Sequence, residues 1–347
     1  MLRITQIRVV IQLSYNIPFL SPVFVPSSTT ETMTTQNKRI FMTGASGYVG
    51  SVITELAIAD GYDVYGLCRS EASEAKLRNL GGVPIHGDLT SIDILRRESA
   101  TADIIIHLAT AYVFGGPPYE EVMHIDTAAI DAMAEPLMGT DKPLVITSGT
   151  LLVAPDPSGA ETTEDSPPTL NPLVTRGKAD QHAFALISKG VRVISIRLAP
   201  FVYGRGGSGV RRFMGMAAQT GGMTCIDGSR NHTTVVHVDD AARLYLLAAE
   251  KGKPGDIFNA SSSTDVTARE MFEAMASAIG VPIRDITSEE AVARMGPVVA
   301  GFLKAENRAS GAKARKELGW QPKGMGILDE INKGSYQAVA KEMRKTK

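Results

Sequence analysis

Short apolar runs alternate along the chain with longer segments of helical apolar spacing, and this alternation restricts the fold more than any other feature. The first helical segment places Val49, Val52, Ile53 and Leu56 on one face. Continuous apolar strands separated by helices are typical of a parallel sheet covered on both faces. Right-handed crossovers then favour a doubly wound α/β sheet. We predict six strands, at residues 39–43, 63–67, 83–86, 103–107, 143–147 and 191–196.

The composition excludes several classes of protein. Lys and Arg number 36 against 37 for Asp and Glu, so a net charge of −1 provides no general attraction to nucleic acid or to an anionic membrane. The two cysteines, Cys68 and Cys225, are too few for a disulfide framework or a Cys-rich zinc site, and they favour a reducing compartment. No uninterrupted apolar run reaches about 18 residues, so we predict no membrane span and a cytoplasmic protein.

A glycine-rich turn lies between the first predicted strand and its helix. Gly44 allows a tight turn, Gly47 lets the backbone approach a pyrophosphate, and Gly50 allows close packing of helix and strand. The free N–H groups at the start of a helix bind phosphate oxygens. The turn therefore predicts a dinucleotide site formed by Gly44, Ser46, Gly47, Tyr48, Val49 and Gly50.

Three regions follow from the changes in pattern along the chain. Residues 1–37 form a leader that carries only Arg3 and Arg8 as charges before Glu31. We expect this leader to be disordered or to target an organelle, and Met33 is a second plausible start. Residues 38–200 hold the dinucleotide-binding core, and residues 201–347 form a small substrate-binding lobe with late returns to the core. In that lobe Thr267 and Glu270 predict the start of a helix.

These motifs resemble the extended short-chain dehydrogenase/reductase family, whose fingerprint is TGxxGxxG. The resemblance extends from residue 38 to about residue 340 and implies a Rossmann-type fold that binds a nicotinamide cofactor. It also implies that Asp88 and Leu89 contact the adenine side, and that Leu108, Ala109, Thr110 and Pro200 line the cofactor. Ser148 lies where the fifth strand of the family delivers a catalytic serine.

The second predicted strand ends at Cys68-Arg69-Ser70, where an acidic residue would favour NAD. A guanidinium next to a hydroxyl suits a 2′-phosphate, so Arg69 favours NADP(H) over NAD(H).

The catalytic segment departs from the family pattern of a tyrosine followed four residues later by a lysine. Lys178 keeps the lysine position, but Val174 replaces the tyrosine. In one interpretation Ser148 or Thr150 polarises the substrate carbonyl, Lys178 binds the nicotinamide ribose, and Tyr112 or Tyr203 supplies the proton. In a second, Arg176 stabilises an oxyanion while water carries the proton, because atypical family members have an Arg and a downstream carboxylate like Arg176 and Asp180. In a third, the protein senses NADP(H) without catalysis.

We therefore predict an NADP(H)-dependent oxidoreductase that acts on a small carbonyl or alcohol, with Ser148, Lys178 and Tyr112 as catalytic residues. An epimerase or dehydratase of the same family, or a non-catalytic NADP(H) sensor, is the alternative. The expected partners are a small-molecule substrate and a second copy in a homodimer. His232 and His237 lack neighbouring ligands at metal spacing, so we predict no metal site. Asp239 and Asp240 are expected to cap a helix over residues 241–250.

Overall fold

The computed structural model describes residues 37–113 and 116–345. The chain divides into two compact units, Met1–Gln36 and Asn37–Lys347, and only the second contains described residues. The predicted leader thus lies outside the described residues, except for Asn37.

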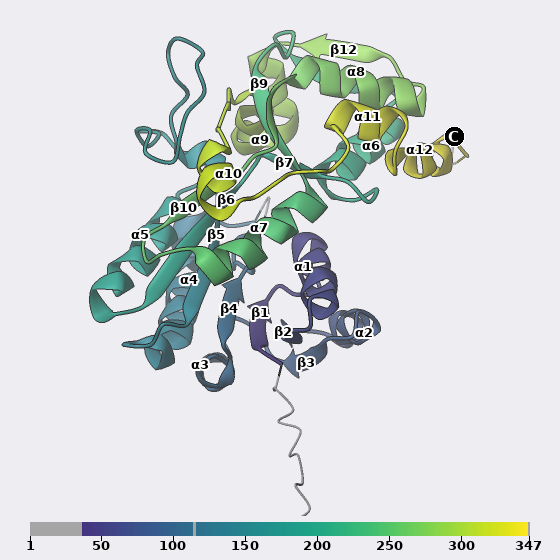
Figure 1. Ribbon diagram of the computed structural model, residues 1–347. Helices are drawn as coiled ribbons and strands as arrows, with labels where there is room; N and C mark the ends of the chain where they lie inside the picture. The colour runs from purple at the N-terminus through teal and green to yellow at the C-terminus, as the bar shows by residue number, and fades with distance from the viewer. Residues whose placement is uncertain (1–36, 114–115, 346–347) are drawn as a thin grey trace, which may run out of the picture. The chain divides into compact units, whose positions relative to one another are not determined.

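A seven-stranded parallel sheet forms the centre of the second unit (Figure 1). Its strand order is β10-β6-β5-β4-β1-β2-β3, which confirms the doubly wound Rossmann-type fold. All six predicted strands are present within two residues of the expected ends, whereas β10 was not predicted. The strands are β1 (Arg39–Thr43), β2 (Asp63–Cys68), β3 (Val83–His86), β4 (Ile104–His107), β5 (Pro143–Gly149), β6 (Arg192–Leu198) and β10 (Ile257–Ala260).

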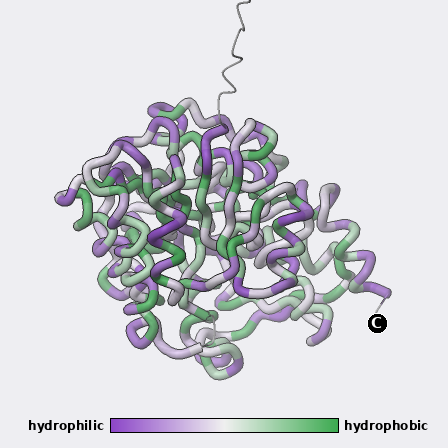
Figure 2. The backbone as a smooth tube through the Cα atoms, turned by 90° about the horizontal axis from the view of Figure 1, so that it is seen from below, coloured by the Kyte–Doolittle hydropathy of each residue, from purple (hydrophilic) through white to green (hydrophobic). Residues whose placement is uncertain are grey.

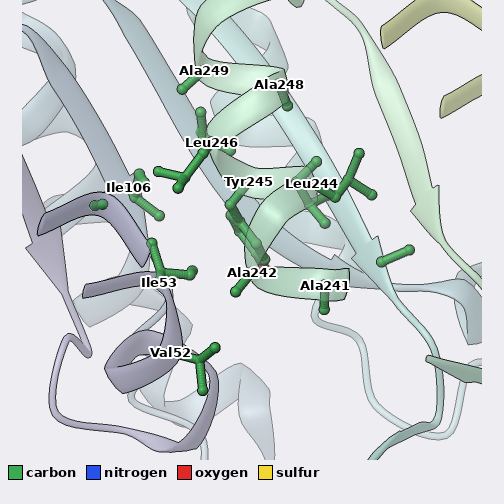
Figure 3. Close-up of a cluster of buried hydrophobic side chains, with 14 of the residues drawn as sticks. Val52, Ile53, Ile106, Ala241, Ala242, Leu244, Tyr245, Leu246, Ala248 and Ala249 are labelled. Carbon is green, nitrogen blue, oxygen red and sulfur yellow. The ribbon is translucent and has the colours of Figure 1, made fainter. Parts of the chain in front are cut away.

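Apolar side chains that alternate along each strand form two cores, one on each face of the sheet. In β1, Ile40 and Met42 join the core shared with α1 and α7, whereas Phe41 joins the core under α3, α4 and α5. Figure 3 shows the first core, where Ile53 of α1 and Tyr245 of α7 lie near Ile106 of β4. These helices are α1 (Tyr48–Ala59), α3 (Ile92–Thr101), α4 (Tyr119–Ala134), α5 (Gly177–Ala185) and α7 (Val238–Lys251), with α2 (Glu71–Asn79) beside β3.

The chain beyond Pro200 builds a separate apolar core and also contributes to the central sheet. The predicted capping box is confirmed, because Thr267 and Glu270 bond each other's backbone N–H at the start of α8. Figure 2 shows short hydrophilic and hydrophobic stretches alternating along the helices, as expected when one helix face is buried. The helices are α6 (Ser208–Thr220), α8 (Ala268–Ile279), α9 (Ser288–Lys304), α10 (Ala312–Leu318), α11 (Ile327–Asn332) and α12 (Tyr336–Lys345).

Two small sheets complete this part, one ordered β11-β9-β7 and the other pairing β12 with β8. Their strands are β7 (Phe201–Tyr203), β8 (Met223–Ile226), β9 (His232–His237), β11 (Ser263–Thr267) and β12 (Ile283–Ile286). Helix α7 starts at Val238, so Asp239 and Asp240 lie in its first turn and do not cap it. The cap is His237, whose Nδ1 accepts a hydrogen bond from the Asp239 N–H at 3.2 Å.

Candidate active site

The turn after β1 has the geometry that a bound diphosphate requires. Gly44 adopts a φ of +74°, which favours glycine. A Cβ at Gly50 would overlap the carbonyl oxygen of Gly44 and would lie 2.9 Å from Cα of Ala45. Helix α1 has neither a side-chain cap nor an acidic residue in its first turn, so its N–H groups are available to an anion.

The side chain of Tyr48 points away from this turn and towards the loop before α6. Its hydroxyl donates a hydrogen bond to the carbonyl oxygen of Gly204 at 2.7 Å, and a Cβ at Gly207 would overlap its ring. Burial raises the pKa of Tyr48 above its usual range, so the hydroxyl stays protonated. Tyr48 can therefore serve a dinucleotide through its backbone, while its side chain fixes the Gly204–Gly207 loop.

Two cations, Arg69 and Lys76, lie in the segment that follows β2, and Lys76 contacts the glycine turn. Arg69 is exposed and has no hydrogen-bonding partner among the described residues. Lys76 of α2 donates a hydrogen bond to the carbonyl oxygen of Ser46 at 2.7 Å, which places a positive charge at the turn. Sequence reasoning missed Lys76, since it considered basic residues only within the turn itself.

Asp88 and Leu89, predicted to lie on the adenine side, follow β3. Asp88 is exposed, and its Oδ1 accepts hydrogen bonds from the N–H of Thr90 at 2.8 Å and from its hydroxyl at 2.6 Å. These bonds lower the pKa of Asp88, so the carboxylate is ionised. Leu89 is buried in the core on the α3 and α4 face of the sheet.

Residues 108–110 lie at the carboxyl end of β4, beside the glycine turn. Ala109 donates a backbone hydrogen bond to Thr43 Oγ1 at 3.2 Å. Buried Asp126 of α4 accepts hydrogen bonds from the Thr110 hydroxyl and from the Ala111 N–H, both at 2.6 Å. The predicted cofactor-lining segment is thus held against β1, but the side chain of Thr110 is already engaged with Asp126.

Burial lowers the pKa of His107, the last residue of β4, to about 4. The ring is therefore neutral, and its Nδ1 lies 2.7 Å from Thr43 Oγ1. Its backbone carbonyl accepts a hydrogen bond from Thr147 Oγ1 at 2.9 Å. His107 thus ties the ends of β1, β4 and β5 together.

A cavity of about 280 Å³ opens at the carboxyl end of β5, and we name it the inner chamber. Ser148, Tyr112, Arg176 and Asp180 line it, so the structure brings Ser148 and Tyr112 of the predicted catalytic set together. Thr147 and Gly149 of β5 also line it, and apolar side chains form the rest of the wall: Leu151, Leu152, Pro172, Leu173, Val174, Val298 and Phe302.

The polar end of the inner chamber is organised around Asp180. Ser148 and Asp180 line the same wall, and the Ser148 hydroxyl lies close enough to the Asp180 carboxylate to lower its pKa. Burial raises the pKa of Asp180 to about 6, while Ser148 and the nearby guanidiniums of Arg176 and Arg197 act in the opposite direction. Arg197 is also anchored, because it donates a hydrogen bond to the carbonyl oxygen of Glu164 at 3.1 Å. Asp180 can therefore change its protonation state within the physiological range.

Lys178 does not lie in the inner chamber. Its side chain is exposed, and it lowers the pKa of Glu120 on the outside of α4. Helix α5 has 3.6 residues per turn, so Arg176 and Asp180 share a face and Lys178 points roughly 200° away from Arg176. The geometry gives no support to the predicted role of Lys178 at the nicotinamide ribose. The pair that faces the chamber is Arg176 and Asp180.

Three other residues named from the sequence have different surroundings. Pro200 is half-buried between β6 and β7, at the same edge of the sheet as Ser148. Tyr203 is buried, and its hydroxyl donates to the carbonyl oxygen of Met325 at 2.8 Å, which argues against it as the proton donor. Thr150 is buried as well and donates to Asn307 Oδ1 at 2.8 Å, so its hydroxyl is not free to polarise a carbonyl.

The described residues contain no group of three or more His, Cys, Asp or Glu side chains that could hold a metal ion. Cys68 and Cys225 are both buried and free. Within the same described ranges, no helix has the length and hydropathy needed to cross a membrane.

Comparison with known proteins agrees with this geometry. The sequence model of the NAD dependent epimerase/dehydratase family matches residues 40–261. The chain is 33% identical over 300 residues to "Uncharacterized protein C2A9.02" of Schizosaccharomyces pombe, which covers 86% of this chain and 99% of that protein. It is 25% identical over 313 residues to 4-hydroxy-2-methyl-3-oxo-4-farnesyl-3,4-dihydroquinoline-1-oxide ketoreductase of Stigmatella aurantiaca, covering 81% and 91% of the two chains.

A solved structure shares the fold at low sequence identity. The dTDP-glucose 4,6-dehydratase DesIV double mutant of Streptomyces venezuelae, crystallised with NAD, superposes with a TM-score of 0.71. It is 20% identical, and the match covers 89% of this chain and 98% of that one. The glycine turn, the sheet order and the family match together show that the chain belongs to the NAD dependent epimerase/dehydratase family.

Proposed function

We propose that the protein is an NADP(H)-dependent oxidoreductase that interconverts a small carbonyl compound and its alcohol. The observation that carries this proposal is the inner chamber, where Ser148, Tyr112 and the Arg176–Asp180 pair line one cavity at the carboxyl end of β5. Ligands of doubly wound sheets bind at this edge of the sheet.

The residues around the glycine turn fit a dinucleotide. Space for a diphosphate exists because Gly44, Gly47 and Gly50 have no side chains. The start of α1 has no side-chain cap, so its N–H groups can donate hydrogen bonds to the phosphates. When bound, the nicotinamide would supply or accept the hydride. Arg69 and Lys76 support a preference for NADP(H), because two cations in the segment after β2 suit a 2′-phosphate better than a ribose hydroxyl.

In this proposal Ser148 donates a hydrogen bond to the carbonyl oxygen of the substrate, and Tyr112 supplies the proton that this oxygen takes up on reduction. Asp180 controls Ser148. A protonated Asp180 can donate to the Ser148 oxygen and leave the Ser148 hydrogen free for the substrate, whereas an ionised Asp180 takes that hydrogen itself. Arg176 adds positive charge at the oxyanion end of the chamber.

The similarity to a ketoreductase supports carbonyl chemistry, although that relative is only 25% identical. Within the same family, an epimerase or dehydratase would use the hydride only transiently. Net consumption of NADPH separates the two, because an epimerase regenerates its cofactor in each turnover.

The experiment is steady-state oxidation of NADPH against a panel of ketones and aldehydes, with NADPH affinity measured by calorimetry. Tyr112→Phe should lower kcat by about a hundredfold or more and leave NADPH affinity intact. Tyr62→Phe is the matched control, because the Tyr62 hydroxyl bonds Glu250 at 2.6 Å and does not line the inner chamber. Tight NADPH binding without turnover of any substrate would contradict the proposal and favour a sensor.

A further inference from the structure

A second cavity continues outward from the inner chamber. It measures about 490 Å³, and we name it the outer chamber. The two chambers are neighbours that share five wall residues, and we call the pair the channel: Tyr112, Pro172, Leu173, Val174 and Val298. The polar groups that would meet a carbonyl lie only at its inner end.

The walls of the outer chamber are mostly apolar. Leu173 and Val174 come from the loop before α5, and Met295, Val298 and Val299 come from α9. Leu173 is 38% exposed, so part of this apolar wall is in contact with solvent. Covering such a wall with an apolar ligand is favourable, because it removes apolar surface from water.

Charge on the channel walls disfavours a phosphorylated ligand. Among the described residues that line the outer chamber, Glu120 is the only charged one. Its carboxylate accepts a hydrogen bond from Thr175 Oγ1 at 2.7 Å, which lowers the pKa of Glu120 and keeps it negative. In the inner chamber the opposite charges of Arg176 and Asp180 offset each other when Asp180 is ionised. Arg176 is the only cation in the described walls, and these walls carry no net positive charge: Glu120 balances Arg176 when Asp180 is protonated, and the two carboxylates outnumber it when Asp180 is ionised.

Helix α9 forms one wall of both chambers. Gly296 has φ 79° and ψ 161°, so the helix is interrupted there and restarts at Pro297. Val298 and Phe302, four residues apart on one face, then line the inner chamber. A Cβ at Gly301 would overlap Leu173, so this glycine lets the helix come against the opposite wall.

We propose that the channel binds a neutral carbonyl compound with an extended apolar tail, either aliphatic or aromatic, and excludes phosphorylated sugars and nucleotide sugars. The carbonyl lies at Ser148 and the tail runs outward between Leu173 and Val298. This inference rests on the proposed function for the orientation of the ligand, and it adds the class of compound that the site accepts.

The test uses unreactive primary amides, from propanamide to octanamide, titrated calorimetrically into the full chain saturated with NADP⁺. The amide carbonyl replaces the ketone and undergoes no hydride transfer. Each methylene buried in the channel should lower Kd by about fourfold, the change that corresponds to roughly 0.8 kcal/mol per CH₂. Dihydroxyacetone phosphate should show no binding.

A matched pair of variants locates the tail. Val298→Asn should weaken octanamide by about tenfold or more and propanamide by less, because Val298 lines both chambers and the longer tail covers more of the wall that it forms. Val292→Asn is the control, since Val292 lies on the same helix, is 45% exposed and lines neither chamber. It should leave both amides unchanged.

The outcomes separate this inference from the proposed function. A Kd that does not change with chain length, or tighter binding of the phosphorylated compound, would overturn the inference even in an active enzyme. Chain-length dependence that Val298→Asn abolishes would support it. If the amides bind in this way but no ketone is turned over, the apolar channel stands and the oxidoreductase proposal fails.

Discussion

Arg69 offers the sharpest test of cofactor preference. We expect Arg69→Ala to weaken NADPH and leave NADH almost unchanged. Arg69 directly follows β2, is exposed, and has no hydrogen-bonding partner among the described residues, so its removal breaks nothing else in that part of the chain. A 2′-phosphate at the end of β2 would be its natural ligand.

The magnitude follows from the type of interaction. A hydrogen bond to a charged group contributes about 1.5–3 kcal/mol, and exposure to solvent places Arg69 near the lower end. Arg69→Ala should therefore raise Kd for NADPH by about tenfold to thirtyfold. Lys76 already donates to the carbonyl oxygen of Ser46, so Lys76→Ala should cost less, about fivefold.

Binding is measured by calorimetry with NADPH and NADH at two salt concentrations. Arg78→Ala is the matched control, because Arg78 lies on α2 near Lys76 but pairs with Glu74 at 2.9 Å. It should leave both affinities within twofold. Arg69→Ala could instead lower the affinities for NADPH and NADH equally, or Arg78→Ala could lower the affinity for NADPH as much as Arg69→Ala does. Either result would mean that the cations act only by general electrostatic attraction. The preference for NADP(H) would then be wrong.

Four further variants test the site. Gly50→Ala should destabilise the fold by about 1–3 kcal/mol in chemical denaturation and should abolish cofactor binding, since its Cβ overlaps the Gly44 carbonyl. Unchanged cofactor affinity in this variant would contradict the assignment of the diphosphate to the glycine turn. Arg176→Ala should lower kcat/KM by more than tenfold while Lys178→Ala stays within twofold, and similar losses would refute the orientation of α5. For carbonyl reduction, kcat/KM should fall about tenfold or more as pH rises through about 6, where Asp180 ionises, and Asp180→Asn should flatten the profile; an unaltered decline would assign the titration to another group.

The central sheet could be predicted because its inner strands are continuous apolar runs. Residues 104–107 and 143–146 are short apolar runs rich in Ile, Leu and Val, which predict buried strands, and both segments are buried in the sheet. Strand β10 was missed because Asn259 interrupts its short apolar run. Its place comes from pairing with β6, a contact between distant parts of the chain that local pattern does not encode.

The orientation of α5 could not be predicted for a related reason. The residues before it, from Asn171 to Arg176, have no helical apolar spacing, and family spacing alone assigned Lys178 to the site. Helix α5 begins at Gly177, and its inward face is the one that carries Asp180, which lines the inner chamber together with Ser148. Lys76 was missed because 30 residues separate it from Ser46, the residue whose carbonyl oxygen it contacts.

In the proposed function, the Arg176–Asp180 pair lies where the family pattern has a tyrosine and a lysine. That arrangement needs a proton-carrying group and a cation that adjusts its pKa, one helical turn apart. Here the cation comes first and the acid four residues later, two positions further along than the resemblance implied. A buried carboxylate is tolerated only where positive charge or hydrogen bonds compensate it, and Arg176, Arg197 and Ser148 do so without fully offsetting its burial. The pKa of Asp180 therefore stays raised, at about 6, and in the proposed function its protonation state controls Ser148 while Tyr112 supplies the proton.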